Sequence, residues 1–558
     1  MTTTVGDVVA CFLERVGIDT GFGIISVHNI PMFDAIARRD RIRMVMPRGE
    51  AGASHMADAH ARVTGGLGLL VSSTGPGVAN AITGLVEARF AGTPVLHLTG
   101  QVPSRLIDRH TGTTHDMPDQ LGLMRAACKL AYRIRTPGEA WGVLVRAATD
   151  ALTAPKGPVS VEIPIDVQKM AASLPPDLDE AFRLPIPAPL EPTDALMDAL
   201  VERVLRARRP MLWAGNGARH AVAEIRALMD LGFGMVTSHA GRGIVPEDHP
   251  MSLGGMNGTG VQTVQDFYRT VDLMLVIGSR LRGQETVDGS TPLPDHRIHV
   301  DIDPAADGRT YGNAMFVLGD SRRVAGRLAD RLKDRLRLDP GYAEDFRAMK
   351  RRAREEFKAT LGPYADFAEQ LRAVVPRDAL WVRDITVANS TWGNRLFEVY
   401  GARDAVHPVG AGIGQGLPLG VGAAVAAGGR KTVVLHGDAG FMMNVSELWT
   451  AVQERLDILF IVMNDAGYGV IRHMQDAAFG GRRVYGDLMP PDFARLAAAA
   501  SARYACVRSA EAFGPTVREQ LRTPGLCIVE VDMRSVGEAP PYHPYAPAKD
   551  ANGKDPAR

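Results

Sequence analysis

Two carboxylates in the last third of the chain have the spacing of a metal site. Asp438 follows the apolar run 433–435, and Asp465 follows the apolar run 458–462. Their separation, 465 minus 438, is 27 residues, which suits one crossover helix between two neighbouring parallel strands. Both acids would then lie at one sheet edge and repel each other unless a cation lies between them. Mg²⁺, completed by waters and a ligand's phosphates, prefers such a shell.

The glycines around Asp438 favour the same interpretation. Gly437 and Gly440 let backbone N–H groups approach a phosphate at the start of the following helix. A Gly-Asp turn after a strand is, by itself, usually only a turn. The correctly spaced pair of acids makes the metal site the better prediction.

A third acid, Glu50, follows the apolar run 44–46 and opens a helix. A lone glutamate at a helix start is usually a favourable partner of the helix dipole.

The elements that would position these residues repeat one pattern. Apolar run, glycine turn, helical spacing and apolar run follow each other over 69–98 and again over 433–462. The middle of the chain shows the same order at 212–217, 273–278 and 299–303. We therefore predict an α/β protein of three consecutive domains, each a mainly parallel sheet flanked by helices, with ligands at the carboxyl ends of the strands.

Proline and charge mark the domain boundaries. Six prolines between 175 and 192 fit an interdomain linker, and the charge-rich stretch 321–358 has the apolar spacing of amphipathic helices. The predicted domains are 1–175, 190–345 (central, Rossmann-like) and 360–535, followed by a tail, 536–558, expected to be a mobile flap or disordered.

Composition excludes several classes of function. A chain of 558 residues is too long for one small binding module, and equal numbers of basic and acidic residues, 63 each, lack the excess that nucleic-acid or anionic-membrane binding needs. The four cysteines contain no CxxC pair, so we expect no disulfide framework or zinc site, and a cytoplasmic protein. The N-terminus has no signal-peptide pattern, and the ligand is expected to be small.

The segments 437–444 and 462–469 resemble the thiamine-diphosphate motif of the acetolactate synthase, pyruvate decarboxylase and benzaldehyde lyase superfamily. That motif runs from Gly-Asp-Gly to Asn-Asn. The resemblance implies that Asp438, Asp465 and the backbone carbonyl of Gly467 hold Mg²⁺.

This chain departs from the motif twice. Ala439 replaces the third glycine, and Asp465 replaces the second asparagine. The second change adds a negative charge beside the diphosphate but retains an oxygen ligand.

The resemblance covers nearly the whole chain. It implies that domain 1–175 binds the pyrimidine of the cofactor and domain 360–535 its diphosphate, and it implies further contacts with the cofactor. Ile413 takes the place of the apolar residue that wedges under the cofactor, with an ordinary core residue as the alternative. Segment 384–389 matches the loop that contacts the diphosphate. Tyr468 and Met474 would line the substrate pocket or serve packing. The implied cofactor-binding residues are Thr386, Val387, Gly412, Ile413, Gly437, Ala439, Gly440 and Tyr468.

The same resemblance implies three catalytic residues. Glu50 would hydrogen-bond the aminopyrimidine of thiamine and promote loss of the C2 proton. His28 stands where benzaldehyde lyase has a catalytic histidine, and His115 where the family has an active-site glutamine; both could move protons near neutral pH, with structural hydrogen bonding as the alternative. Because Glu50 reaches a neighbouring subunit's cofactor in relatives, we expect at least a homodimer, commonly a homotetramer.

The leading prediction is a thiamine-diphosphate lyase or carboligase that acts on a 2-hydroxyketone or 2-oxo acid through an enamine. Acetolactate synthase or 2-oxo acid decarboxylase is the alternative within this chemistry. The glycines at 215 and 217 and the acids at 301 and 303 suggest an FAD- or NAD-binding oxidoreductase, which ranks lower because they lack the full dinucleotide fingerprint. A bound, non-redox FAD and a catalytically silent homologue are the remaining alternatives.

Overall fold

The computed structural model describes residues 3–176, 178 and 182–541. The chain divides into two compact units, which are described separately. Unit 1 comprises Met1–Pro187, Pro408–Thr432 and Met442–Ile458, and unit 2 comprises Ala188–His407, Val433–Phe441 and Leu459–Arg558.

Unit 1 contains a six-stranded sheet in the order β2-β1-β3-β4-β6-β5, with every neighbouring pair parallel. Its strands are β1 Thr20–Gly23, β2 Arg43–Val45, β3 Gly68–Ser72, β4 Val95–Gln101, β5 Leu130–Arg133 and β6 Val159–Pro164. Because all strands run in one direction, the loops after β1, β2, β3 and β4 leave the same edge of the sheet.

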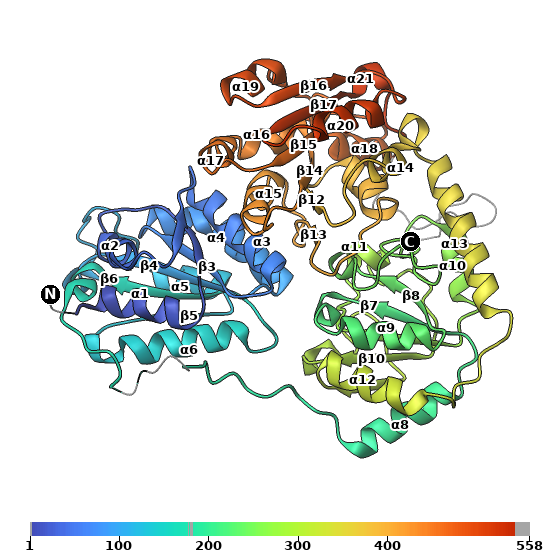
Figure 1. Cartoon of the computed structure of the whole chain (residues 1–558), viewed down its shortest axis with the longest axis horizontal. Helices are drawn as coiled ribbons and strands as arrows, with labels where there is room; N and C mark the ends of the chain where they lie inside the picture. Colours follow the sequence, from blue (N-terminus) through green and yellow to red (C-terminus); the bar gives the residue numbers. More distant parts are fainter. Residues whose placement is uncertain (1–2, 177, 179–181, 542–558) are drawn as a thin grey trace. The chain divides into compact units, whose positions relative to one another are not determined.

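Helices cover both faces of this sheet (Figure 1). Alternate strand residues such as Leu69 and Leu98 pack with α1, α2 and α6, whereas His97 on the other face lies between the hydroxyls of Ser72 and Ser160. The helices of unit 1 are α1 Val5–Arg15, α2 Ile30–Arg39, α3 Glu50–Thr64, α4 Pro76–Ala91, α5 Gln120–Ala127, α6 Ala140–Leu152, α7 Ile165–Lys169, α15 Gly416–Val425 and α17 Glu447–Gln453, with short 3₁₀ turns η1 Ser104–Leu106 and η2 Pro137–Glu139.

Close helix crossings hold α3 in place. Gly84 of α4 faces Ser54 of α3, and a Cβ there would lie 2.1 Å from the serine Oγ. Gly422 of α15 faces the backbone of Met56, and a Cβ there would lie 2.3 Å from its carbonyl oxygen. Glycine at both crossings therefore lets the backbones approach more closely than any side chain would permit.

Unit 2 contains two further sheets. The central sheet has five strands in the order β11-β10-β9-β7-β8, namely β7 Pro210–Ala214, β8 Gly234–Thr237, β9 Leu273–Ile277, β10 Arg297–Asp301 and β11 Met315–Leu318. The third sheet has six in the order β13-β12-β14-β15-β17-β16, namely β12 Leu380–Arg383, β13 Ala405–Val406, β14 Thr432–Gly437, β15 Ile458–Asn464, β16 Arg503–Val507 and β17 Cys527–Asp532. The prediction of three mainly parallel sheets flanked by helices is confirmed.

One hydrophobic core runs through both sheets of unit 2. Trp213 and Phe346 belong to its central part, and Trp381, Trp392 and Phe513 to its third-sheet part. The helices are α8 Asp194–Leu205, α9 Val222–Asp230, α10 Gln262–Tyr268, α11 Gly283–Thr286, α12 Ser321–Leu332, α13 Tyr342–Ala359, α14 Phe367–Arg372, α16 Asp438–Met443, α18 Gly469–Ala478, α19 Phe493–Ala499, α20 Phe513–Leu521 and α21 Met533–Val536. Shorter turns are η3 Asn216–Ala218, η4 His239–Gly241, η5 Pro304–Ala306, η6 Gly362–Tyr364 and the π-type turn η7 Asn389–Gly393.

The proline-rich segment contains neither helix nor strand at its described residues. Most of the predicted tail, from residue 542 onward, lies outside the described residues. Among the described helices, none has the length and apolar character required to cross a lipid bilayer.

The close crossing of α15 over α3 predicts opposite changes in stability for two Gly→Ala substitutions. Gly422→Ala should destabilise the protein by about 1–3 kcal/mol, because the new methyl group meets backbone atoms that cannot rotate away. Gly142→Ala in α6 should instead stabilise it by roughly 0.5–1 kcal/mol through helix propensity, since a Cβ there meets nothing within 4 Å. Urea unfolding of both variants provides the measurement; equal effects would show that the crossing is not tight.

Candidate functional site

Asp438 and Asp465 lie at the carboxyl ends of adjacent strands in unit 2. β14 ends at Gly437, so Asp438 is the first residue of α16, and Asp465 follows the last residue of β15. Asp438 is 1% exposed. Burial raises its pKa to about 7, and the charge of Asp465 and a side-chain hydrogen bond with it add to the rise. Two acids that the sequence places 27 residues apart thus interact directly.

A third charged side chain, Arg472 of α18, binds the outer carboxylate. Its Nη2 lies 2.9 Å from Asp465 Oδ2 and donates to the Asp465 carbonyl oxygen at 2.8 Å, while Nη1 binds Asp487 at 3.0 Å. Arg472 therefore balances the additional negative charge that Asp465 brings to this edge. This arginine was not identified from the sequence, although it lies only seven residues after Asp465.

Gly467 and Tyr468 form the turn between β15 and α18. Gly467 has φ +156°, and a Cβ there would lie 2.1 Å from the Gly486 carbonyl oxygen. The Tyr468 N–H donates to that same oxygen at 2.8 Å, and an antiparallel bridge pairs Gly467 with Asp487. Segment 486–487 thus fixes the conformation of the turn that contains the Gly467 carbonyl.

The remaining diphosphate-loop residues of unit 2 lie beside these acids. A Cβ on Gly437 would contact Thr386 Oγ1 at 3.3 Å, and a Cβ on Gly469 would contact Val387 Cγ2 at 3.5 Å. Ala439 and Gly440 are buried in the first turn of α16. The structure therefore brings the loop after β12 together with the two acids.

Beneath this edge lies a buried pair that sequence reasoning did not use. His436 Nδ1 lies 3.1 Å from Asp384 Oδ2, and both side chains are fully buried. His436 is the penultimate residue of β14, and Asp384 follows β12. The pair links the two strands that carry the Gly437 and Thr386 loops.

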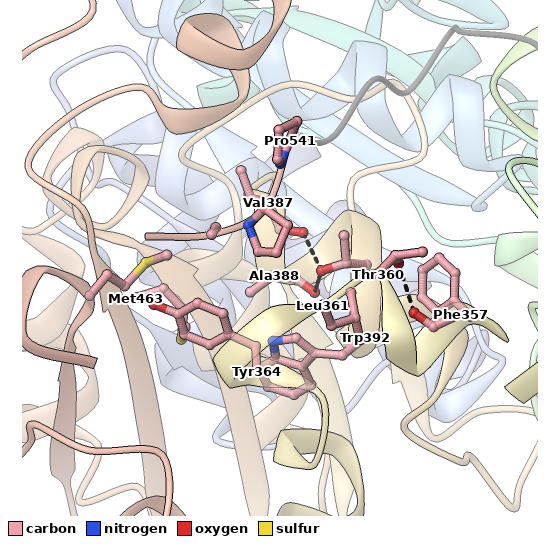
Figure 2. Close-up of a pocket in the computed structure, with 13 residues that line it drawn as sticks. Phe357, Thr360, Leu361, Tyr364, Val387, Ala388, Trp392, Met463 and Pro541 are labelled. Carbon is pink, nitrogen blue, oxygen red and sulfur yellow. Dashed lines mark hydrogen bonds between the residues drawn. The ribbon is translucent and has the colours of Figure 1, made fainter. Parts of the chain in front are cut away.

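An apolar cavity of about 50 Å³ adjoins the loop after β12 (Figure 2). Val387, Trp392, Met463 and Pro541 line it together with Tyr364, whose hydroxyl donates to the Gly537 carbonyl oxygen at 2.6 Å. Burial raises the pKa of Tyr364, and the charges of Asp465 and Asp532 raise it further. The last described residues of the chain thus help to enclose a cavity close to the acids.

In unit 1, Glu50 is the first residue of α3 and is 9% exposed. Asn80 Nδ2 donates to its Oε2 at 3.3 Å, and a Cβ on Gly77 would lie 2.8 Å from its Oε1. The carboxylate is held at the carboxyl edge of the sheet, next to the start of α4.

Glu447 of α17 holds the start of the helix that carries Glu50. Both of its carboxylate oxygens accept from the Arg48 N–H at 3.1 Å, and Thr450 Oγ1 donates to Oε2 at 2.6 Å. A Cβ on Gly52 would lie 2.2 Å from Glu447 Oε1. Burial raises the pKa of Glu447, against the lowering effect of Thr450 and of the backbone donors. The negative charge lies at the positive end of α3, where a carboxylate is favoured.

The two histidines predicted from distant segments lie side by side in unit 1. His115 Nδ1 is 3.3 Å from His28 Nδ1, and the ring centroids are 5.2 Å apart. His28 is 8% exposed, whereas His115 is exposed and has φ +65°. Burial lowers the pKa of His28, and the neighbouring His115 lowers it further, so His28 is neutral near pH 7.

A buried polar network supports the loops that carry these histidines. Gln120 Oε1 accepts from Thr74 Oγ1 at 2.6 Å and from the Gly75 N–H at 2.7 Å. Its Nε2 donates to Glu162 Oε2 at 2.9 Å and to the Gly100 carbonyl oxygen at 3.1 Å. A Cβ on Gly75 would strike the His115 carbonyl oxygen, and one on Gly100 that of His28. Gln120 ends the sequence segment that contains His115, so its position could have indicated this supporting network.

Gly412 and Ile413 lie in the Pro408–Thr432 segment of unit 1, whereas Asp438 lies in unit 2. Ile413 is 38% exposed. Asn444 Nδ2 donates to the Gly414 carbonyl oxygen at 2.7 Å and so anchors the loop. An isoleucine held on an exposed loop contrasts with the ordinary core residue that was the alternative.

Comparison with known families matches three segments of the chain. Residues 3–123 match the N-terminal TPP binding domain of thiamine pyrophosphate enzymes, residues 197–328 their central domain, and residues 386–531 their C-terminal TPP binding domain. A probable 2-ketoarginine decarboxylase of Pseudomonas aeruginosa is 32% identical over 479 residues, 84% of each chain. The chain belongs to the thiamine pyrophosphate enzymes.

Other similar proteins are named acetolactate synthases. The acetolactate synthase large subunit of Corynebacterium glutamicum is 30% identical over 87% of this chain and 79% of its own. The large subunit of acetolactate synthase isozyme 1 of Escherichia coli is 26% identical over 96% of this chain and 94% of its own. The similarity to thiamine pyrophosphate enzymes thus extends over nearly the whole length.

The acids of unit 2 fit the divalent ion that would accompany thiamine pyrophosphate. Asp438 Oδ1 is buried and has no hydrogen-bond partner among the described residues, which is the state expected of an oxygen reserved for a cation. Within the described part of the chain no cluster of three or more His, Cys, Asp or Glu side chains could hold a metal. The two carboxylates, one of them with an unpartnered buried oxygen, are therefore a set of donors that fits a divalent ion.

The repulsion at Asp438 predicts opposite effects of one variant with and without metal. Because the pKa of Asp438 rises from 3.8 to about 7, its folded-state charge becomes more costly as the pH rises through this range. Asp438→Asn should therefore stabilise the metal-free protein by about 1–3 kcal/mol at pH 8 and by less at pH 5. It should also remove the stabilisation by Mg²⁺ with thiamine pyrophosphate. Thermal unfolding measures both effects.

Asp487→Asn is the matched control, because the Asp487 carboxylate is 85% exposed and also binds Arg472. It should leave both stabilities nearly unchanged. Retained stabilisation by Mg²⁺ in Asp438→Asn, or a gain that does not depend on pH, would contradict the role of Asp438.

Proposed function

We propose that this thiamine pyrophosphate enzyme is a lyase or carboligase that breaks or makes the C–C bond of a 2-hydroxyketone or 2-oxo acid. The observation that carries the proposal is the contact of His28 and His115 at 3.3 Å, at the sheet edge where Glu50 begins α3. Cleavage of a 2-hydroxyketone requires removal of a hydroxyl proton and delivery of another to the product, and a pair of imidazoles suits both transfers.

The two histidines have different environments. The lowered pKa of buried His28 makes it a neutral acceptor, whereas the His115 ring is exposed to solvent. The support is geometric: one Nδ1 lies within hydrogen-bond reach of the other, so a proton taken by His28 has a path outward. Gln120 and the glycines at 75 and 100 keep both rings at this distance.

The cofactor, when bound, stabilises the carbanion released as the bond beside the carbonyl breaks. Glu50 would hold a proton at the aminopyrimidine through Oε1, the carboxylate oxygen that the Asn80 donor leaves available. Asp438, Asp465 and the Gly467 carbonyl would hold Mg²⁺. The diphosphate would contact the loops of Thr386, Val387, Gly437, Ala439, Gly440 and Tyr468, and Ile413, next to Gly412, would support the two rings.

Acetolactate synthase or 2-oxo acid decarboxylase is the alternative, and relatives bearing both kinds of name support it. Those names set the substrates that must be tried: pyruvate for the synthase and 2-ketoarginine for the decarboxylase.

An additional FAD is a weaker proposal. The glycines that suggested a dinucleotide have another role, because the Gly217 N–H donates to the Gly278 carbonyl oxygen at 2.9 Å. A Cβ on Gly215 would lie 2.3 Å from that oxygen. These glycines permit two loops of the central sheet to approach each other. This close packing accounts for glycine at positions 215 and 217 without a bound nucleotide.

We further propose at least a homodimer, commonly a homotetramer, in the cytoplasm. Apolar side chains next to His28 remain exposed in unit 1, among them Val27 at 63% and Ile25 at 51%, and such a surface favours a covering subunit. The four cysteines are free thiols, which suits a reducing compartment.

Glu50→Gln tests cofactor activation. It should lower kcat by at least about 100-fold, because the amide cannot hold the required proton, while affinity for Mg²⁺ and thiamine pyrophosphate stays within threefold. Single-turnover kinetics and calorimetry provide the two readouts. The exposed Glu519 of α20 offers a control, since Glu519→Gln should change neither; unchanged turnover in Glu50→Gln would reject the role.

Product analysis decides the reaction. The protein, supplied with Mg²⁺ and cofactor, should release an aldehyde from benzoin or acetoin, and His28→Gln should slow that release at least tenfold. Acetolactate from pyruvate, or an aldehyde and CO₂ from benzoylformate or 2-ketoarginine, as the dominant activity would establish the alternative instead. A flavin absorbance band that bleaches with substrate would establish an oxidoreductase.

A further inference from the structure

Glu87 of α4 is a buried acid of unit 1 that the proposed reaction does not use, and it is 2% exposed. Its Oε1 accepts from the Val409 N–H at 2.5 Å, and its Oε2 accepts from the Gly410 N–H at 2.9 Å. A Cβ on Gly410 would lie 3.0 Å from the same Oε2, so this part of the chain lies directly against the acid. Each carboxylate oxygen of Glu87 thus binds one of two successive backbone donors.

A buried ion cluster fixes the Glu87 side chain. Arg62 of α3 donates from Nη2 to Glu87 Oε1 at 2.9 Å. The same guanidinium donates from Nε to Asp58 Oδ1 at 2.9 Å and to Thr93 Oγ1 at 3.3 Å, and all these side chains are buried. Because an ionised carboxylate only accepts hydrogen bonds, Glu87 can hold the guanidinium and both backbone donors at once. A side-chain amide has one acceptor oxygen and cannot do so.

The loop that follows these donors has a backbone that needs support. Ala411 has φ +62° and Gly414 has φ +86°, and the left-handed region is unfavourable for alanine. Such a conformation persists where the surrounding contacts hold it. Glu87 holds the chain before Ile413, and Asn444 holds it afterwards through its hydrogen bond to the Gly414 carbonyl oxygen. Ile413 therefore lies between two anchors.

The helix that carries Glu87 also contacts Glu50. Asn80 of α4 donates to Glu50 Oε2 at 3.3 Å. Asn80 lies seven residues before Glu87 (87 minus 80), which is about two helical turns and places both residues on one face of α4. One helix therefore holds both the carboxylate at the start of α3 and the chain that leads to Ile413.

We propose that Glu87 is a positioning residue for thiamine pyrophosphate, because it fixes the loop that presents Ile413. The proposal rests on the role given to Ile413 under the proposed function, the support of the two rings of the cofactor. Glu87 acts through the backbone: its hydrogen bonds to Val409 and Gly410 set the position of residue 413 and so the affinity for the cofactor.

Glu87→Gln tests the anchor, because the amide retains the shape of the side chain but loses one acceptor oxygen. In the full-length protein, calorimetry with Mg²⁺ present should show a Kd for thiamine pyrophosphate at least about tenfold higher. Hydrogen exchange of the amides of residues 409–414 in the cofactor-free protein should become at least about tenfold faster. Neither readout requires turnover.

Asp58→Asn is the matched control, because Asp58 binds the same guanidinium whereas the loop donors bind Glu87. It should lower the unfolding temperature as Glu87→Gln does, since both variants remove a charge from one buried cluster. It should change the Kd and the exchange of residues 409–414 by less than about threefold. Equal effects of the two variants on loop and cofactor would leave Glu87 with a role in stability alone and would overturn the proposal.

Hydrogen exchange of the unchanged protein provides a measurement that does not require a variant to fold. The N–H groups of Val409 and Gly410 should exchange at least about 100-fold more slowly than those of an unstructured peptide of the same sequence. Exchange at the rate of the peptide would reject the anchor.

Ile413→Ala separates this proposal from the function on which it rests, because it removes the side chain and keeps the anchor. It should raise the Kd for thiamine pyrophosphate at least about tenfold and leave the exchange of Val409 and Gly410 unchanged. An unchanged Kd in Ile413→Ala would overturn the role of Ile413. A raised Kd there, together with an unchanged Kd in Glu87→Gln, would overturn the role of Glu87 alone.

Discussion

The repulsion between Asp438 and Asp465 is the constraint around which unit 2 is arranged. Parallel strands deliver their following residues to one edge, so two acids after adjacent strands must share a small volume. Burial of Asp438 strengthens the repulsion, and Arg472 relieves it on the outer side only. The inner side, where Asp438 Oδ1 has no described partner, remains a place for a divalent ion. The sheet thus concentrates the negative charge that the proposed Mg²⁺ would balance.

The chain segment after Asp438 also serves unit 1. Glu447 lies nine residues on (447 minus 438) and caps the helix that begins with Glu50. One short segment therefore carries a proposed metal ligand and the support of the proposed proton donor. Loss of order in this segment would disturb both units through chain connectivity alone.

Much of this arrangement could be predicted from the sequence. Apolar runs and glycine turns indicate the strands, and the 27-residue spacing is sufficient to pair Asp438 with Asp465. His28 and His115 were each assigned to the site only through family resemblance. Their contact was not predicted, because two loops 87 residues apart must fold before the rings meet. Glu447 was missed because its partner, Arg48, is 399 residues away, and no local pattern signals such a contact.

The bridge between Gly467 and Asp487, together with Arg472, closes segment 467–487 at its base. The middle of this segment is far more open, with Phe479 57% and Val484 54% exposed. The contacts that anchor segment 467–487 therefore involve other residues than those on its exposed surface. Substitutions of the outer residues can therefore accumulate without disturbing the contacts that anchor the turn at Gly467, the proposed ligand of Mg²⁺.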